Sequence, residues 1–572
     1  MQTIVRLPED LEQDLVRFRE EVERFKLGIL SPDDFRAMRV PMGIYEQRQN
    51  GTYMLRVRLT GGCMLPHQMR ALASVSRKYG NGVLHVTTRQ DIQIHQVLFN
   101  NLCPAIEELH QVQLSTKGGG GNTVRNITVC QDSGVCPRAF FDTTSYAIAL
   151  TEQMLRDPRS FRLPRKFKIN FGGCSDACSG ATVADIGFVA KDRKGSLGFS
   201  VYVGGGMGAR SRVADLLEEF IPSSEVYLVA EAIKRVFDKC GNREDRNQAR
   251  LRFLLEKIGL DAFRKLYRAE FDDLKSQNLP PLQLRPMPRR RPAISEFEGA
   301  PDRKFYAWRR VNVLEQNQKG YFLVRIPLHL GDIAADKLTT LSKIADRHGE
   351  GMIRATQRQS LTLRWVPEQD LPSVHQGLHA LGLAKPTPRM MREIIACAGA
   401  TTCRLGFCNS RGLAAAISKQ IEASDLPLDE FDPVTIYISG CSNSCSRHPI
   451  ARIGLMGSAR RVGDHLAPYY IASLGGVLHE RRTRFAQGKI PLPARNIPRF
   501  VEDFLRLFRA SANFPDFDAF LATDGKLILA ELADKHGHLP SFDDDPSYYT
   551  DWGATELFSI EGRGSGECSA GR

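Results

Sequence analysis

The stretch FGGCSDACSGA, residues 171–181, decides the fold, because ISGCSNSCSRH at residues 438–448 repeats its cysteine spacing. An earlier pair of cysteines in each half completes two quartets, which are Cys130, Cys136, Cys174 and Cys178, and Cys397, Cys403, Cys441 and Cys445. The four cysteines of the second quartet are displaced from their counterparts by one constant offset, since 397 minus 130 equals 403 minus 136, 441 minus 174 and 445 minus 178. This constant offset indicates an internal duplication, so we expect two similar halves related by a pseudo-twofold axis.

Each half contains the same succession of predicted strands and helices. Apolar and polar residues alternate in TYMLRVRLT, residues 52–60, which predicts a strand, whereas PHQMRALASVSRKYG, residues 66–80, has the period of a helix. FKINFGGC and VTIYISGC predict strands that run directly into the C-x3-C loops. These patterns indicate the α+β class with mixed sheets, in which the cysteines lie in loops at strand ends.

The length and composition are those of a multidomain globular protein. The chain has 572 residues, of which 25% are charged and 42% hydrophobic. Its first 26 residues form an amphipathic helical pattern without an apolar signal core, and no long apolar run follows, so we expect a cytoplasmic protein without a membrane span. The net charge of +13 comes from scattered basic residues, apart from RPMPRRRP at 285–292. This pattern favours anionic small molecules or acidic proteins as partners over nucleic acid.

The spacing of the cysteines is compatible with two kinds of metal site. Four thiolates on two loops suit an iron–sulfur cluster. Zinc sites also use C-x3-C pairs, but a C-x5-C pair is wider than their usual spacing. In a chain without an export signal, thirteen cysteines indicate metal or redox chemistry rather than disulfides. From spacing alone, an iron–sulfur protein and a zinc-stabilised basic binder of nucleic acid both remain open.

Several further motifs follow one another in a fixed order along the chain. The first half contains LRVRLTGG, TTRQDIQIH, TVRN, LPRKFK, VGGGMG and GNREDRNQARLRFLLE, and the second contains ACAGATTC and SGCSNSC. Together they resemble the sirohaem-dependent sulfite and nitrite reductases, over about residues 35 to 510. The resemblance implies that each half consists of a ferredoxin-like half-domain and a mixed-sheet domain of the sirohaem and [4Fe-4S] type.

The resemblance also implies a division of the chain into seven parts. They are an N-terminal helical extension (1–44), ferredoxin-like half-domains (45–115 and 303–380), sirohaem/[4Fe-4S]-type domains (116–276 and 381–512), a Pro/Arg-rich linker (277–302), and a C-terminal extension (513–572) with a flexible tail that carries Cys568.

Cofactor and substrate ligands follow from the same resemblance. The second quartet would hold a [4Fe-4S] cluster, and the sulfur of Cys445 would also be the axial ligand of the sirohaem iron. The residues implied to bind the sirohaem are Arg58, Arg89, Gln93 and His95. The cations implied to bind the substrate anion are Arg56, Arg125, Lys166 and Lys168. Fixed positive charge suits both partners, because sirohaem is a polycarboxylate and sulfite is an anion.

The first quartet departs from typical single-chain members of the family, which keep only the second one. Dissimilatory sulfite reductases, built from paired subunits, offer a precedent for additional clusters. The offset that relates the two quartets pairs Arg125 with Arg392, Arg58 with Arg325, Arg56 with Leu323, Lys166 with Pro433, and Lys168 with Thr435. We therefore expect one catalytic pocket, built from first-half cations over the second-half cluster. The first quartet is a candidate for a second cluster, with or without an inactive tetrapyrrole.

The predicted reaction is the six-electron reduction of sulfite to sulfide. In the family, the second lysine of the KFK pair tends to be lysine in sulfite reductases and asparagine in nitrite reductases, so Lys168 favours sulfite. Nitrite reduction, dual activity and a non-catalytic iron–sulfur carrier are the alternatives. Because no flavin or nicotinamide domain is evident, electrons would come from a separate protein, either a ferredoxin or a flavoprotein subunit.

Overall fold

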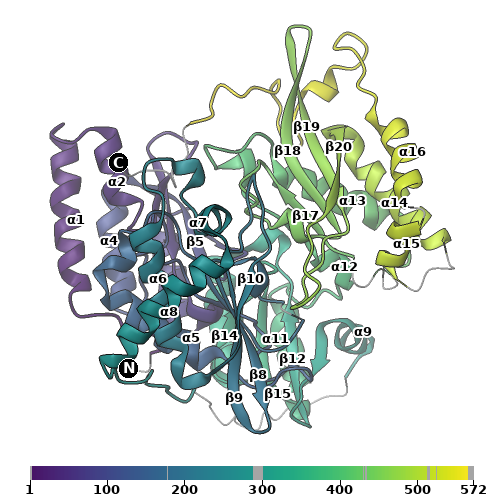
Figure 1. Ribbon diagram of the computed structural model, residues 1–572. Coiled ribbons are helices and arrows are strands. Elements are labelled where there is room, and N and C mark those ends of the chain that lie inside the picture. The colour runs from purple at the N-terminus through teal and green to yellow at the C-terminus, as the bar shows by residue number, and fades with distance from the viewer. Residues whose placement is uncertain are drawn as a thin grey trace.

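The chain folds into four five-stranded sheets, two in each half, with helices packed around them (Figure 1). In this computed structural model the described residues are 3–176, 178–287, 301–428, 431, 434–511, 516–523 and 525–564. Residues 288–300 of the expected linker, and the expected flexible tail with Cys568, lie outside the described residues. The mixture of helices and mixed sheets, repeated in both halves, confirms the predicted fold class and duplication.

The two ferredoxin-like sheets exchange one strand with each other. The first contains, in order of pairing, β1 (Ile44–Glu46), β2 (Thr52–Val57), β5 (Ile92–Leu98), β4 (Val83–Val86) and β13 (Asp332–Ala334). The second contains β11 (Val313–Glu315), β12 (Tyr321–Ile326), β15 (Leu361–Pro367), β14 (Ile353–Ala355) and β3 (Cys63–Met64). Each half therefore supplies an edge strand to the sheet of the other, and the two sheets share one apolar core.

The other two sheets carry the cysteine loops. The first has the order β10 (Asp215–Pro222), β9 (Ser196–Val203), β8 (Ile186–Arg193), β7 (Ile169–Gly172) and β6 (Thr128–Val129). The second has the order β16 (Ile394–Ala396), β17 (Ile436–Ser439), β18 (Ile453–Val462), β19 (His465–Leu474) and β20 (Gln487–Pro493). Strands β6, β7 and β8 are parallel, as are β16, β17 and β18. Because parallel strands end at the same edge of a sheet, the loops after adjacent strands bring their cysteines together.

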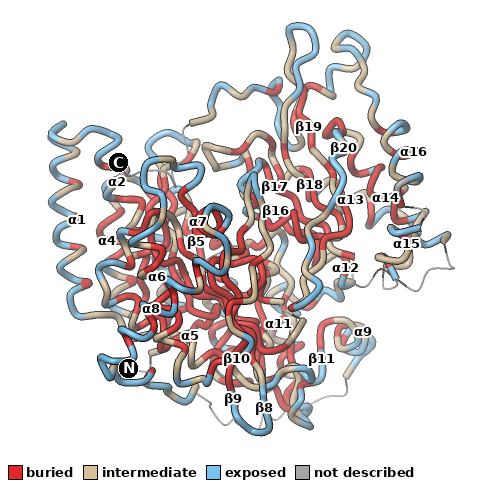
Figure 2. The backbone as a smooth tube through the Cα atoms, viewed as in Figure 1, coloured by how far each residue is buried: buried red, intermediate tan, exposed pale blue. Residues whose placement is uncertain are grey.

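Helices cover these sheets and bury their apolar sides, so that the most buried backbone runs through the centre of the molecule (Figure 2). Those of the first half are α1 (Leu11–Lys26), α2 (Pro32–Arg39), α3 (Pro66–Tyr79), α4 (Leu102–His110), α5 (Thr144–Arg156), α6 (Val226–Cys240), α7 (Leu251–Ile258) and α8 (Leu260–Ser276). Those of the second half are α9 (Arg303–Asn312), α10 (Ala335–Arg347), α11 (Leu371–Ala380), α12 (Arg389–Arg392), α13 (Ser410–Ala423), α14 (Ile497–Ala510), α15 (Phe517–Thr523) and α16 (Gly525–Gly537). Within the described ranges, none of them combines the length and apolar character that a membrane crossing needs.

The strand registers reveal how the two halves correspond. Arg56 on β2 lies opposite Gln93 on β5, and Arg325 on β12 lies opposite Thr362 on β15. The two pairs are equivalent, since 325 minus 56 equals 362 minus 93. Arg56 thus corresponds to Arg325, so the expected matches of Arg56 with Leu323 and of Arg58 with Arg325 are both wrong. The reason is that the ferredoxin-like sheets are offset by two residues more than the cysteine loops, a difference that a single offset conceals.

Candidate active site

The second cysteine quartet occupies two loops that leave the sheet at the ends of β16 and β17. Cys397 directly follows β16, and its N–H donates to the carbonyl of Ile438 on β17 at 3.1 Å. The N–H of Gly440 donates to the Cys397 sulfur at 3.2 Å, and the hydroxyl of Ser410 lies 3.3 Å from the same sulfur. Hydrogen bonds to ligand sulfurs are one of the means by which proteins tune iron–sulfur clusters.

The four thiols fit an iron–sulfur cluster. Burial raises the pKa of Cys403 to about 11, and the neighbouring Cys397 and Cys441 contribute to the rise. Thiolates this close together repel one another unless a positive centre compensates their charge. Cys445 is exposed whereas the other three are half-buried, so its sulfur is accessible to a further group. In the described part of the chain no three His, Cys, Asp or Glu side chains converge on one metal ion; a four-iron cluster is larger than a single ion.

Segments of the first half lie against these loops. The hydroxyl of Thr88 donates to the carbonyl of Cys445 at 2.7 Å, and the Arg48 guanidinium donates to the carbonyl of Gly406 at 2.9 Å. Lys166 lies close enough to Cys445 to favour its thiolate electrostatically. Side chains of both halves therefore meet at Cys445, the cysteine at which a cluster and a sirohaem would share a ligand.

Arg56 and Arg125, two of the cations expected to bind the anion, share a backbone carbonyl. Their Nη1 atoms donate to the carbonyl of Gly119 at 3.1 and 2.8 Å. The Arg56 guanidinium also lies 4.9 Å from the centre of the Tyr45 ring. Residue 119 must be glycine, because a Cβ there would approach the carbonyl oxygen of Arg56 to 2.8 Å. A carbonyl is neutral, so this contact orients the two guanidiniums without cancelling their charge.

The buried carboxylate beside Lys168, that of Asp185, already forms an ion pair with another residue. Asp185 accepts the backbone N–H of Lys168 at 2.9 Å and pairs with the Arg250 guanidinium through contacts of 2.8–3.2 Å. No carboxylate of the described residues forms an ion pair with the Lys168 ammonium. Burial, followed by the charges of Arg89 and Arg250, lowers the pKa of Lys168 well below its usual value. Lys168 is therefore suited to stabilise an anion when protonated and to give up a proton readily.

Three of the residues expected beside the sirohaem are held by polar contacts. Arg89 donates to the side-chain oxygen of Asn170 at 3.2 Å, and its buried Nε has no partner in the described ranges. The ring nitrogens of His95 lie 3.2 Å from the side chain of Gln93 and 3.1 Å from that of Gln47. Burial lowers the pKa of His95 to about 3, so the ring is neutral near pH 7 and adds no charge to the pocket.

Arg58, the fourth residue of this expected set, supports the backbone of a neighbouring segment. It is buried, and its guanidinium donates to the carbonyls of Lys117 and Arg125 at 3.1 and 3.4 Å. Burial lowers the pKa of Arg58 to about 10, which leaves it protonated at neutral pH. These contacts fix the chain at Arg125 and so position that side chain.

Sequence reasoning missed two features of this pocket, the Asp185–Arg250 pair and the carbonyl of Gly119. Arg250 lies in the motif GNREDRNQARLRFLLE, so a signal for it existed. Asp185 directly precedes β8 and belongs to none of the motifs that resemble the reductase family. Their ion pair joins residues 65 positions apart, and a single sequence does not indicate such a pairing.

Family models match both kinds of domain. Residues 120–274 match "Nitrite and sulphite reductase 4Fe-4S domain", and residues 45–112 and 314–381 match "Nitrite/Sulfite reductase ferredoxin-like half domain". The first of these segments contains the first cysteine quartet. The two matches of the half-domain model fall in different halves of the chain, as the duplication predicts.

Individual relatives are similar over most of the chain. A ferredoxin-nitrite reductase of Synechococcus elongatus is 29% identical over 480 residues, which cover 82% of this chain and 89% of the relative. Sulfite reductase (ferredoxin) 2 of Mycolicibacterium paratuberculosis is 29% identical over 467 residues, which cover 77% and 80%. The structure of the NirA protein of Mycobacterium tuberculosis superposes with a TM-score of 0.74 at 25% identity, over 89% of this chain and 94% of that one.

Proposed function

We propose, from the premise that this chain belongs to the sirohaem-dependent nitrite and sulfite reductases, that it catalyses the six-electron reduction of sulfite to sulfide in one pocket. The chain is an oxidoreductase of that family, whose cofactors are sirohaem and a [4Fe-4S] cluster. The proposed cluster ligands are Cys397, Cys403, Cys441 and Cys445. Cys445 would also bind the sirohaem iron, with Arg58, Arg89, Gln93 and His95 as the residues that hold the tetrapyrrole.

The observation that carries the proposal is the positive charge of the first-half pocket. Arg56 is held by a neutral carbonyl, and the buried carboxylate nearest Lys168 is already paired with Arg250. Lys166 lies on the same segment, close to Cys445. An electron carrier has no need of such a cation set, whereas a reductase of oxyanions needs it to bind its substrate.

Each cation has a distinct task in this scheme. Arg56 and Arg125, aligned by the same carbonyl, would bind substrate oxygens through charge-assisted hydrogen bonds. When bound, the cluster and sirohaem supply the electrons and the metal at which the substrate is reduced. Lys168, whose pKa burial lowers, would donate protons as the oxygens leave as water, with Lys166 beside it in the same role.

The preference for sulfite rests on Lys168. Sulfite carries more negative charge than nitrite near neutral pH, so an additional ammonium favours sulfite. Nitrite reduction is the second candidate, because the ferredoxin-nitrite reductase of Synechococcus elongatus matches the chain at the same 29% identity as the sulfite reductase and over a larger share of it, 82% against 77%. Competition between the two anions for one enzyme distinguishes these proposals.

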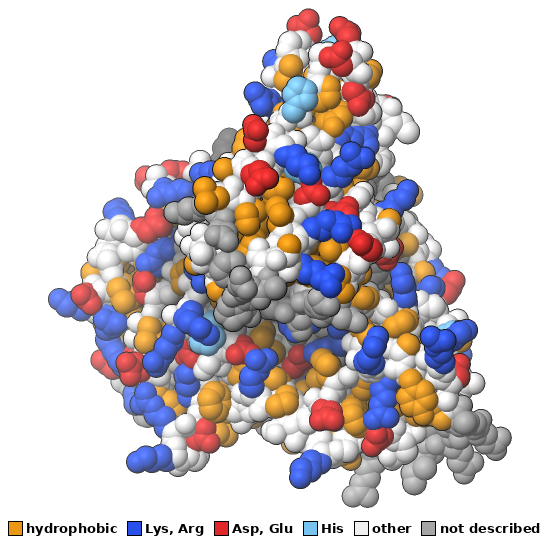
Figure 3. All heavy atoms as spheres, turned by 90° about the vertical axis from the view of Figure 1, so that its right-hand side faces the viewer, with side chains coloured by type: hydrophobic (Ala, Val, Ile, Leu, Met, Phe, Trp, Pro, Cys, Tyr) orange, Lys and Arg blue, Asp and Glu red, His pale blue; other side chains and the backbone are white. Residues whose placement is uncertain are grey.

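A ferredoxin is the proposed electron donor, because the relatives carry that donor in their names. The net charge of +13 favours an acidic partner. On the face shown in Figure 3 the basic side chains alternate with acidic ones. Such a surface would orient a small acidic protein through several local pairs rather than one uniform patch.

The first experiment is an absorption spectrum of the purified protein, followed by turnover with a reduced ferredoxin and either anion. We expect a sirohaem spectrum and a higher kcat/KM for sulfite than for nitrite. A protein with the sirohaem spectrum and a higher kcat/KM for nitrite would reverse the substrate assignment. A protein that binds no tetrapyrrole after reconstitution would contradict the proposal. The variant Cys445→Ser tests whether the Cys445 sulfur binds both the cluster and the sirohaem iron, and we expect it to lose turnover.

A further inference from the structure

The first cysteine quartet lies in loops built like those of the second. The N–H of Cys136 donates to the carbonyl of Asp132 at 2.9 Å, and the N–H of Cys403 donates to the carbonyl of Gly399 at 3.0 Å. The two bonds join equivalent positions of the duplication, since 403 minus 136 equals 399 minus 132. The duplication has therefore preserved the backbone geometry that presents cysteines at both places.

Each quartet is contacted by the opposite half in the same way. The N–H of Arg48 donates to the carbonyl of Thr402 in the second quartet's loop at 2.9 Å. The N–H of Asn317 donates to the carbonyl of Val135 in the first quartet's loop at 2.8 Å. The first quartet thus faces the second half of the chain as the second quartet faces the first half.

The thiols of the first quartet lie close to one another. The side chain of Cys178 lies next to those of Cys130 and Cys174, and the Arg138 guanidinium lies next to the side chain of Cys136. Cys130 and Cys174 are buried, and all four thiols are free. Four gathered thiols on two loops form a soft ligand set, which suits an iron–sulfur cluster.

The pocket opposite the first quartet differs from the active pocket in its charge. Arg325, the counterpart of Arg56, donates to the two carboxylate oxygens of Asp132 at 2.7 and 2.5 Å. The side chains of Arg325 and Asp132 are only 14% and 16% exposed. Asp132 lies between two cysteines of the first quartet, where the second quartet has Gly399. Asp132 therefore forms an ion pair with Arg325. The counterpart of Arg325 in the other half, Arg56, is the arginine that is proposed to bind the substrate.

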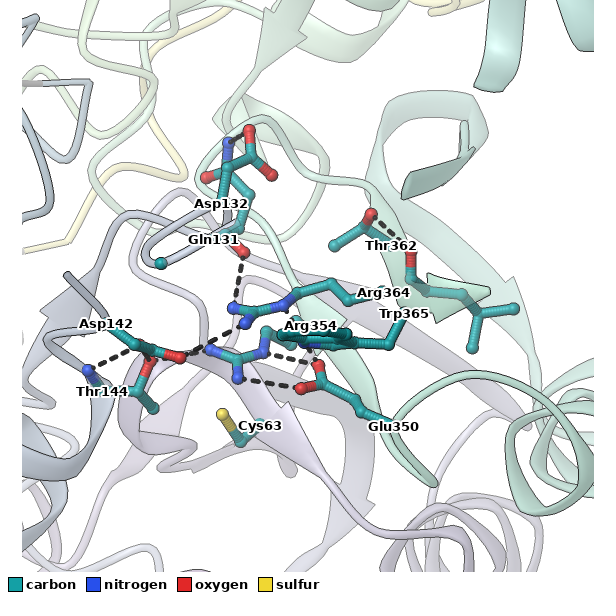
Figure 4. A network of polar contacts seen from close by, with 12 residues as sticks. Cys63, Gln131, Asp132, Asp142, Thr144, Glu350, Arg354, Thr362, Arg364 and Trp365 are labelled. Atoms are coloured by element: carbon teal, nitrogen blue, oxygen red, sulfur yellow. Dashed lines mark hydrogen bonds and ion pairs between the residues drawn. The ribbon is translucent and has the colours of Figure 1, made fainter. Parts of the chain in front are cut away.

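Two other arginines opposite the first quartet are paired with carboxylates as well, whereas Arg392, the counterpart of Arg125, forms no ion pair in the described ranges and has a buried Nη1 without a partner. Arg358 lies 2.8 Å from Glu393. Arg364 lies between Asp142 at 3.2 Å and Glu350 at 3.3 Å, as Figure 4 shows. An anion could bind these arginines only by displacing their carboxylates, of which Glu350 and Glu393 are buried and would be left without a charge partner.

We propose that Cys130, Cys136, Cys174 and Cys178 bind a second [4Fe-4S] cluster, and that the Asp132–Arg325 pair keeps substrate anions away from it. The positions equivalent to the two lysines also favour a closed pocket, because Pro433, outside the described residues, and Thr435 carry no charge there. The cluster itself is inferred from the four thiols. The closed pocket rests on the proposed function, because that function identifies Arg56 as an anion ligand.

The cluster is tested by iron and acid-labile sulfide analysis of the holoenzyme, prepared without oxygen and reconstituted with iron and sulfide. We expect two clusters' worth of non-haem iron per chain, and one in the double variant Cys174→Ser/Cys178→Ser. The control Cys240→Ser changes an exposed thiol and should keep both. One cluster's worth in the reconstituted unmodified protein would overturn the proposal even if the double variant fails to fold. The sirohaem absorbance, read from the same samples, separates this failure from failure of the proposed function.

The closed pocket is tested by electron paramagnetic resonance of the holoenzyme, kept reduced by an excess of chemical reductant, with and without sulfite. The signal that disappears in the double cysteine variant belongs to the first cluster, and sulfite should leave it unchanged. In Asp132→Gly, which restores the glycine found in the second quartet, sulfite should shift that signal. Asp176→Asn removes a carboxylate that pairs with Arg138 at 2.7 Å and leaves Arg325 paired, so its signal should stay insensitive. A sulfite-induced shift in the unmodified protein, or none in Asp132→Gly, would overturn the closed pocket.

Discussion

Lys168 is the residue at which charge and substrate choice are most closely linked. Its ammonium has no ion-pair partner in the described part of the chain, and the nearest buried carboxylate, Asp185, is committed to Arg250. Lys168→Asn should therefore lower kcat/KM for sulfite about tenfold more than for nitrite, because the more highly charged anion loses more attraction. Steady-state rates with both anions measure this ratio, and Lys257→Asn, an exposed lysine, is the control. Equal losses for the two anions would remove the physical basis for preferring sulfite.

The same residue predicts a pH dependence. Burial and neighbouring cations lower the pKa of Lys168, so its charge is lost as pH rises through that lowered value. Because only the protonated form attracts an anion, kcat/KM for nitrite should fall on the alkaline side. Nitrite is the better probe here, since its own charge is constant over this range whereas that of sulfite changes. In Lys168→Arg the fall should move to higher pH, because a guanidinium stays protonated. An unchanged alkaline limb in this variant would assign the titration to another group.

The turn at Gly119, which follows the first ferredoxin-like half-domain, orients both Arg56 and Arg125. A Cβ at position 119 would lie 2.8 Å from the carbonyl of Arg56 and 2.9 Å from that of Thr116. Gly119→Ala should displace the carbonyl that orients Arg56 and Arg125, and raise KM for both anions about tenfold with a smaller effect on kcat. Gly537→Ala, where no atom lies within 4 Å of the added Cβ, is the matched control. A KM that rises for one anion alone would show that the turn does not act through the shared carbonyl.

The elements also explain how much the sequence could reveal. The repeated quartets and motifs predict the duplication and the α+β class, because each is encoded in a short local pattern. The exchange of β3 and β13 has no local signature, since these strands have only two and three residues and pair across halves. Candidate residues such as Lys168 could be found from a motif. Their partners could not, because the Asp185–Arg250 and Asp132–Arg325 pairs join distant parts of the chain.

The whole molecule combines two related pockets that differ in whether their arginines form ion pairs with carboxylates. In one, Arg56 is held by a neutral carbonyl, the buried Asp91 near it forms no ion pair in the described ranges, and Lys168 has no paired carboxylate there. In the other, Arg325 and Arg364 are neutralised by carboxylates of the chain itself. The shared core and exchanged strands hold both pockets in one framework. After a duplication, both halves can thus retain a set of metal-binding cysteines, while a few carboxylates restrict substrate binding to one half.

The stability of the whole molecule should depend on pH in mild acid, because buried histidines are neutral in the folded state. Burial lowers the pKa of His110 to about 4 and that of His448 to about 4, against about 6.5 in an unfolded chain. As pH falls below about 6.5, the unfolded chain takes up protons that the folded chain excludes. The free energy of unfolding therefore falls with pH, and this contribution is fully present only above that value.

His110→Leu isolates one of these histidines, whose two ring nitrogens are buried without a partner in the described ranges. The substitution should reduce the loss of unfolding free energy between about pH 7 and about pH 5 by about 1 kcal/mol, allowing for partial exposure of the ring. Urea unfolding followed by circular dichroism at several pH values measures this difference, with the exposed His329→Leu as control. If His110→Leu lost stability in acid as steeply as the unmodified protein, His110 would have to be charged in the fold. Its burial would then have to be compensated by Asp14 and Glu107, the two carboxylates whose charges oppose the shift.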